Sequence, residues 1–193
     1  RHEAVAQNRA ANRPEGRCSV KWAGIILGGL AAVVALMAAI GALLPKEHVA
    51  TQSARFKSQP AVVWQAITDV TKFPQWRRDL KEIVPPPPGG DARAGWTEVW
   101  THGERVPIEV KEWNPPAKLV TRIAAKDLAF GGTWTYELAP SSGGTELRIT
   151  EHGEVYNPLS RFLSRFVFGH TTTMRTYLAA LGDSLGDRVE VKD

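Results

Sequence analysis

Five polar side chains have the types and settings that proton-transfer chemistry needs: Glu98, His102, Glu151, His152 and His170. A carboxylate in an apolar cavity has a raised pKa and acts as an acid or base near neutral pH. An imidazole titrates in the same range without help from its surroundings. The chemistry that such groups support is the movement of a proton alpha to a carbonyl group.

Glu98 lies in a strand predicted over 96–102, but alternation alone does not say which face of that strand points inward. One face carries Glu98, Trp100 and His102, and the other carries Thr97, Val99 and Thr101. Aromatic content favours the first face as the inner one, and β-branched content favours the second. Glu98 is therefore a weak catalytic candidate, with a solvent-facing or ion-paired role as the alternative.

Glu151 and His170 are the other two weak catalytic candidates. Glu151 shares the parity of Ile149 along a strand predicted over 145–155, so it points toward the apolar side of that strand. His170 lies four residues after Phe166 on the apolar face of a predicted C-terminal helix. The structural alternatives are an ion-paired carboxylate and a hydrogen-bonded core histidine. No residue is assigned a catalytic role beyond these candidates.

Motifs for metal, nucleotide or hydrolase chemistry are absent from the sequence. The histidines show neither HxH nor HExxH spacing, and there is no P-loop, GxGxxG or GxSxG motif. The single cysteine, Cys18, excludes an internal disulfide. We therefore expect no metal and no cofactor.

The net charge of +4 over 193 residues is unevenly distributed. Residues 1–44 carry a net +3, and the remainder carries a net +1. Phosphate recognition needs a basic surface, which a nearly neutral domain lacks. Nucleic acid is therefore not expected as a partner.

Residues 22–44 form an uninterrupted apolar run, WAGIILGGLAAVVALMAAIGALL, without any charged residue. As a helix this run spans about 34 Å, slightly more than the roughly 30 Å of a bilayer core. Trp22 at one end and Pro45–Lys46 at the other suit the two membrane interfaces. A buried core helix, the alternative, normally keeps a polar face. The run therefore predicts a transmembrane helix.

Basic residues are slightly more frequent before this span than after it. Arg9, Arg13, Arg17 and Lys21 precede it, and Lys46, Arg55 and Lys57 follow it. This bias predicts a single-pass protein of the cytoplasmic membrane, with the N-terminus inside and the soluble domain extracytoplasmic. Residues 1–19 are mostly polar and show no pattern of a helix or strand, and we hypothesise that the native chain begins near Val20. Lys21 and the terminal amine would then preserve the orientation.

Two glycines in the span, Gly24 and Gly28, match the small-xxx-small pattern of paired transmembrane helices. The pattern predicts a homodimer through these residues. The alternative is that Gly and Ala are simply frequent throughout the segment.

The rest of the chain alternates short apolar segments with turn residues. A strand over 51–57 precedes a helix capped by Ser58 and a shorter helix capped by Asp69 or Thr71. Further strands are predicted over 80–84, 96–102, 106–113, 119–124, 133–139 and 145–155, with a stiff PPPPGG loop at 85–90. From Pro158 onward, apolar residues recur at helical spacing, with Asn157 as the expected cap, Pro158 in the first turn, and Gly169 as a weak point and site of a kink. The pattern predicts an α+β fold with an antiparallel meander.

Residues in these elements resemble the START/Bet v 1-like (SRPBCC) superfamily, in the form described as polyketide cyclase/dehydrase-like. The resemblance covers about residues 50–187. It rests on Pro60, Val63–Trp64, Ile67, Asp69, Phe73–Pro74 and Trp76, on GGTWTY at 131–136, GTEL at 144–147, ITEHG at 149–153, and NP at 157–158. It implies a helix-grip architecture, in which a curved antiparallel sheet wraps around a long C-terminal helix. The resemblance is specific for the fold and not for one reaction.

The resemblance also implies an internal cavity between the sheet and the helix. The side chains expected at this cavity are Trp64, Phe73, Trp76, Trp100, Trp134, Tyr136, Phe166, His170, Met174 and Tyr177. For Trp64, Phe73 and Trp76 the alternative is plain core packing.

The implied function is that of a membrane-anchored binding protein for a hydrophobic small molecule or lipid. The alternative is a cyclase/dehydratase-like enzyme that uses a cavity carboxylate or histidine as acid or base. We favour binding because no convergent acid–base pair can be recognised in the sequence. A chaperone-associated interaction module fits the superfamily but not an extracytoplasmic location.

The expected organisation has five parts. They are a polar tail over 1–21, a transmembrane helix over 22–44, a linker over 45–50, a START/Bet v 1-like domain over 51–187 and a C-terminal tail over 188–193.

Overall fold

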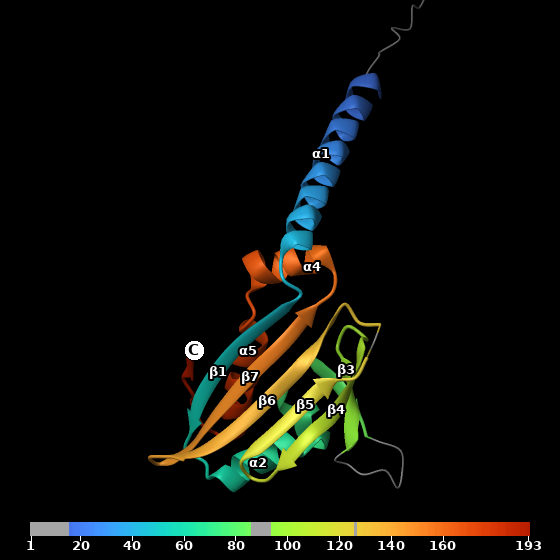
Figure 1. The fold of residues 1–193 in the computed structure, drawn as a ribbon. Helices are drawn as coiled ribbons and strands as arrows, with labels where there is room; N and C mark the ends of the chain where they lie inside the picture. Colours follow the sequence, from blue (N-terminus) through green and yellow to red (C-terminus); the bar gives the residue numbers. More distant parts are fainter. Residues whose placement is uncertain (1–15, 86–93, 126) are drawn as a thin grey trace, which may run out of the picture.

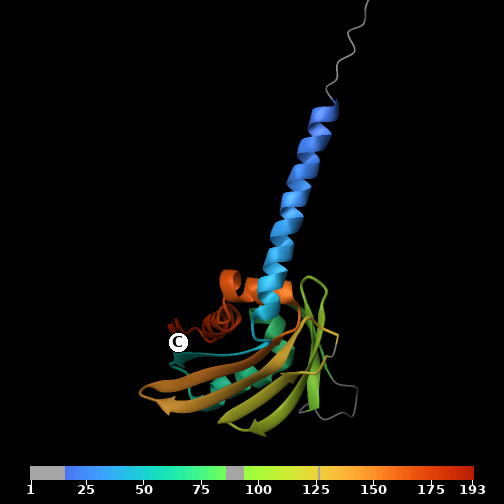
Figure 2. The ribbon, with the colours of Figure 1, turned by 45° about the horizontal axis from the view of Figure 1, so that its top comes forward.

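The computed structural model describes residues 16–85, 94–125 and 127–193 (Figure 1). Most of the expected polar tail and of the PPPPGG loop lies outside the described residues. Within them, a long helix precedes a curved sheet, and the last helices of the chain lie against the concave side of that sheet (Figure 2). The expected α+β helix-grip fold with an N-terminal apolar helix is confirmed.

The sheet has eight strands among the described residues, and every neighbouring pair is antiparallel. In spatial order the strands are β2 (Leu80–Val84), β3 (Gly95–Trp100), β4 (Arg105–Asn114), β5 (Lys118–Ile123), β6 (Phe130–Ser141), β7 (Gly144–Val155), β1 (Glu47–Phe56) and β8 (Val191–Lys192). From β2 to β7 the order is sequential, which is the meander that closely spaced turn residues predict. The long β6–β7 hairpin and its pairing with β1 form the centre of the sheet.

Side-chain alternation decides which face of the sheet is covered. Along β7, Leu147 and Ile149 are completely buried, whereas Arg148 between them is exposed. This is the period-two pattern of a sheet with one face in the core. The parity predicted for Glu151 therefore holds, and its side chain points to the concave face.

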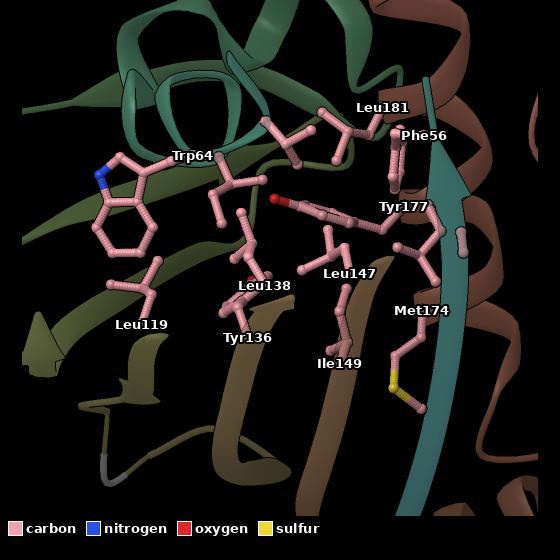
Figure 3. Close-up of a cluster of buried hydrophobic side chains, with 14 residues drawn as sticks. Phe56, Trp64, Leu119, Tyr136, Leu138, Leu147, Ile149, Met174, Tyr177 and Leu181 are labelled. Carbon is pink, nitrogen blue, oxygen red and sulfur yellow. The ribbon is translucent and has the colours of Figure 1, made fainter. Parts of the chain in front are cut away.

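The main core lies between the concave face, α2 (Pro60–Thr68) and α5 (Thr172–Ser184) (Figure 3). Tyr177 reaches from α5 toward residues of β6 and β7, and Trp64 projects from α2. Burial of each such side chain contributes about 1.5–3 kcal/mol to folding. A smaller cluster of Phe73, Leu80 and Trp96 closes the end near η1 (Val70–Lys72) and α3 (Phe73–Trp76).

The C-terminal helical stretch is interrupted rather than continuous. It comprises α4 (Pro158–Leu163), the π-helical turn η3 (Ser164–Phe168) and α5, with a break at Gly169. Gly169 has a positive φ of 74°, which residues with a side chain rarely adopt. The expected weak point is therefore the place where the helix ends. Asn157 caps α4 as expected, because its side chain accepts hydrogen bonds from the backbone N–H groups of Leu159 and Ser160.

The apolar helix α1 (Gly16–Leu43) contacts the domain at α4. A side chain at Gly41 would overlap the backbone carbonyl of Pro158, so glycine allows this close approach. The buried Arg161 donates hydrogen bonds to the carbonyl of Leu44 at 2.9 Å and of Tyr156 at 3.3 Å. A cation at the C-terminal end of a helix also complements its dipole. Figure 1 shows α4 lying across the base of α1.

Three local expectations differ from the structure. Strand β1 begins at Glu47, inside the segment expected as a linker, because it pairs with β7 along its whole length. Residues 188–193 include β8, and Asp193 accepts hydrogen bonds from Gln52 and Arg175, so this end is not a free tail. The N-cap of α2 is Gln59, whereas Ser58 donates its hydroxyl to Asp187.

Candidate functional site

A cavity of about 390 Å³ lies between the concave face of the sheet and the segment that joins α4 to α5. Its sheet side is formed by Trp96, Trp100, Val106, Ile108, Thr121, Ile123, Phe130, Trp134 and Tyr136. Ser160, Ser164, His170 and Thr173 line the opposite side. Small-molecule sites in proteins have this size range and this largely apolar lining, with a few polar groups to orient the ligand.

A second hollow of about 450 Å³ lies on the outer surface, between α2, η1, α3 and the end of α5. Its rim carries charged and amide side chains, including Asp69, Lys72 and Gln75. Because more of its lining residues are polar than apolar, we consider the first cavity the candidate site.

One polar group of the cavity is an ion pair between Arg77 and Glu98. The Arg77 Nη1 donates to Glu98 Oε1 at 2.6 Å, and its Nη2 donates to Glu98 Oε2 at 3.1 Å. Indole N–H groups of Trp96 and Trp100 donate to the same carboxylate at 3.4 and 3.2 Å. Both charged side chains are largely buried, at 11% and 8% exposed. The fork geometry fixes Glu98 and leaves it little freedom to act as a base.

Burial alone would lower the pKa of Arg77, but Glu98 and Asp79 outweigh it and raise that pKa. Arg77 therefore stays protonated at any physiological pH. Burial also raises the pKa of Tyr136 and of Tyr177, which keeps both phenols neutral. Arg77, Tyr136 and Tyr177 therefore keep one protonation state near pH 7 and offer fixed hydrogen-bonding groups.

The second polar group of the cavity consists of His48, Glu151 and His170. His48 Nε2 lies 3.5 Å from Glu151 Oε1, and the rings of His48 and His170 stack with centroids 3.8 Å apart. The side chains of His48 and Glu151 are 17% and 19% exposed. Three titratable groups from β1, β7 and the α4–α5 connection therefore meet at one wall of the cavity.

Burial raises the pKa of Glu151 to about 7, and a hydrogen bond from Trp134 offsets only part of this shift. Burial and the neighbouring His170 lower the pKa of His48, and burial followed by Arg165 lowers the pKa of His170. All three shifts favour neutral forms, so burial outweighs the attraction between His48 and Glu151. A carboxyl group that titrates near pH 7 can accept or donate a proton there.

We expect Glu151→Gln to change how stability depends on pH. A folded-state pKa of about 7 against an ordinary value of 4.5 gives stabilisation that is complete below pH 4.5 and lost as pH rises through 7. The shift corresponds to roughly 3 kcal/mol. Relative to the variant, the unmodified protein should lose roughly that much unfolding free energy between about pH 4 and about pH 8.

The measurement is the unfolding free energy of the detergent-solubilised chain across this pH range. His48 and His170 have lowered pKa values, so they reduce stability as pH falls below 6.5. Both histidines remain in the variant, so the part of their effect that does not depend on Glu151 cancels in the difference between the two proteins. Parallel pH profiles for the two proteins would show that Glu151 does not titrate in this way.

The structure distributes the expected cavity residues over four environments. Trp100, Trp134, Tyr136 and His170 line the cavity. Trp64, Phe73, Met174 and Tyr177 are buried in the core, and Trp76 packs against Phe73 and Tyr177 while lining the outer hollow. Phe166 is 60% exposed and does not line the cavity, because η3 turns it outward.

The catalytic candidates are also separated. Glu151 and His170 lie in one cluster, whereas Glu98 is held in the ion pair with Arg77. His102 and His152 are exposed. Trp96, Glu98 and Trp100 line the cavity together, so the aromatic face of β3 is the one that faces it.

Sequence reasoning missed His48, Arg77, Phe130 and Ser164. His48 lies in a segment expected as a linker, and Gly153 opposite it leaves room for its ring. Arg77 is one of two adjacent arginines after α3, and the sequence shows no sign that it is buried. Within the described residues, no group of three His, Cys, Asp or Glu side chains is arranged to hold a metal ion.

Solved structures with the same fold cover most of this domain. Protein MLL2253 from Mesorhizobium loti is 17% identical with a TM-score of 0.56, over 72% of this chain and 97% of that one. A START superfamily protein from Mycobacterium smegmatis is 14% identical with a TM-score of 0.57, over 72% and 97%. Norcoclaurine synthase from Thalictrum flavum, in complex with dopamine and hydroxybenzaldehyde, is 9% identical with a TM-score of 0.56, over 72% and 86%. At these identities the likeness shows the fold alone.

No curated protein matches the chain significantly in sequence. A family model does match, over residues 47–190, which extend from the first strand to the segment before the last one. The match therefore includes the whole cavity and both of its polar groups. The chain belongs to the family described as polyketide cyclase / dehydrase and lipid transport.

Proposed function

We propose that this protein is a membrane-anchored binding protein that holds a hydrophobic small molecule or lipid in its cavity. The observation that carries the proposal is the cavity of about 390 Å³, whose sheet side is mostly aromatic and aliphatic. A preformed apolar pocket binds a ligand by removing apolar surface from water. The family match and the START-like fold support a ligand-binding role in general.

Anchoring is supported by α1. Residues Trp22–Leu43 form a helix with mean hydropathy 2.5, and none of its most apolar stretch is buried against the domain. Its length suits a bilayer, although a signal sequence has a similar composition. We propose a single pass through the cytoplasmic membrane, with the N-terminus inside and the domain outside. A reporter fused after Asp193 that is active only in the cytoplasm would overturn this orientation.

Pairing of two chains through Gly24 and Gly28 is also part of the proposal. Both glycines face open space, because apart from the neighbouring backbone of α1 no atom of the described residues lies within 4 Å of the position that a side-chain methyl group would take at either residue. A second helix can therefore approach closely at this point.

The binding proposal is tested by native mass spectrometry of the full chain released from gentle detergent. We expect a fraction of the protein to carry an additional apolar molecule, identifiable after extraction. Protein that is folded but carries no such molecule, and that takes up none when incubated with an extract of its own membranes, would contradict binding.

A cyclase/dehydratase-like enzyme is the second candidate, and the cluster of His48, Glu151 and His170 favours it. A neutral Glu151 donates a proton and its carboxylate accepts one, both at a cavity wall. If the protein is an enzyme, extracted molecules should include a pair that differs by one water, and Glu151→Gln should retain only the heavier one. A carrier predicts one set of molecules for both proteins.

A further inference from the structure

Three consecutive large apolar residues, Phe166, Val167 and Phe168, are exposed on the surface of the domain. Their exposed fractions are 60%, 60% and 65%. Large apolar side chains are common on protein surfaces one at a time, but a contiguous group indicates a contact with something apolar. We call these three residues the apolar lip. They form most of the π-helical turn η3.

The lip lies at the end of the domain where α1 enters. It closely follows α4, and α4 is held to α1 by the close approach at Gly41 and by the Arg161 bond to Leu44. Figures 1 and 2 show this segment beside the base of α1. Leu43 and Val49, close to the same junction along the chain, are 88% and 64% exposed.

The segment that carries the lip is also a wall of the cavity. Ser164 and Gly169 line the cavity, and the lip lies in the stretch between them. Gly169 has a positive φ, and η3 is a π-helical turn, a form that often occurs at functional positions in helices. The segment from Ser164 to Gly169 therefore exposes the three apolar side chains of the lip on the surface, while the residues at its two ends line the cavity.

We infer that the apolar lip inserts into the bilayer that α1 spans, at the boundary between headgroups and acyl chains, and that the ligand passes between this bilayer and the cavity beside the lip. This inference rests on the proposed function, because it requires a membrane anchor and a bound ligand. Beyond the proposed function, the inference names the bilayer as the source of the ligand and the lip as the surface beside which the ligand enters the cavity.

A bilayer is the occupant that the observations favour. The covalent link through α1 keeps the lip near the membrane at high effective concentration. Arg165 precedes the lip and is exposed, and a cation in this position can reach the phosphate groups of lipid headgroups, which both leaflets carry. An apolar surface with a flanking cation is the pattern of segments that lie in the membrane interface.

The depth of the lip is measured in the full chain by spin labelling. Cys18 is the single cysteine, so Cys18→Ser with Val167→Cys gives one site for a nitroxide. The control carries Cys18→Ser with Ser142→Cys in the turn between β6 and β7, where Ser142 is exposed. Both are reconstituted in vesicles of phosphatidylcholine and phosphatidylglycerol.

We expect the label at 167 to be more accessible to oxygen than to a water-soluble nickel complex, at a depth of about 5–10 Å. The label at 142 should show the reverse. A label at 167 that behaves like the one at 142 overturns the inference, and so does a label at 167 that neither oxygen nor the nickel complex reaches, which would show a second copy covering the lip. Native mass spectrometry of the same labelled proteins reports ligand binding separately, so either claim can fail alone.

Discussion

Replacing Ile123 and Ser164 together by tryptophan is expected to reduce the retained apolar ligand at least about tenfold, equivalent to about 1.4 kcal/mol of binding free energy. Ile123 lines the cavity from β5, and Ser164 lines it from η3. Two indole rings would occupy space that a ligand needs, and interiors that are already filled exclude a guest. The measurement is the ligand-bearing fraction in native mass spectra, compared at equal protein concentration.

The matched control is Val120→Trp with Ser142→Trp. Val120 lies on the same strand as Ile123 but faces the other side of the sheet, and Ser142 lies in an exposed turn. Both proteins gain two tryptophans, so a general effect of added aromatic surface is the same in each. Equal ligand retention in the filled variant and the control would mean that the ligand does not occupy this cavity.

Replacing Arg77 by methionine is expected to lower the unfolding free energy by about 3–5 kcal/mol. The change leaves the carboxylate of Glu98 largely buried, and among the described residues its remaining partners are the indole N–H groups of Trp96 and Trp100. The penalty arises because a buried charge without its counter-ion has lost its hydration. Chemical unfolding of the detergent-solubilised chain measures it.

Asp79→Asn is the control for this experiment. Asp79 also accepts a hydrogen bond from Arg77, at 2.7 Å, but its side chain is 48% exposed. Its loss should change stability by less than about 1 kcal/mol. Adding Glu98→Leu to the Arg77 variant should restore much of the stability, because no buried charge then remains. An Arg77 variant as stable as the Asp79 variant would show that the ion pair is not a buried one in solution.

The parts of the fold that follow local rules could be predicted from the sequence. Alternation in 145–155 correctly placed Ile149 and Glu151 on the covered face, because a strand in a one-sided sheet has no other way to bury its apolar residues. Asn157 before Pro158 predicted the start of α4 for an equally local reason. The succession of short strands predicted the meander.

The candidate site depends on register and on packing between distant segments, which the sequence does not encode locally. His48 meets Glu151 only because β1 pairs with β7 in a register that sets His48 against Gly153. His170 joins them because the chain breaks at Gly169 and returns to the sheet. In the sequence, Phe166 has the spacing that would place it on the apolar face of a continuous α-helix. The π-helical turn changes the rotation per residue, so the side chain of Phe166 points outward instead.

The central claim, that an apolar molecule lies inside the cavity, is tested most directly by photo-crosslinking from within it. A small diazirine-bearing analogue of leucine in place of Ile123 lies at the cavity with little change in side-chain volume, and the same residue in place of Val120 lies on the opposite face of β5. After irradiation of membranes from cells that produce the full chain, we predict that an apolar molecule is attached at position 123 and not at position 120. Attachment at both positions equally, or at neither while the protein is folded, would contradict the account.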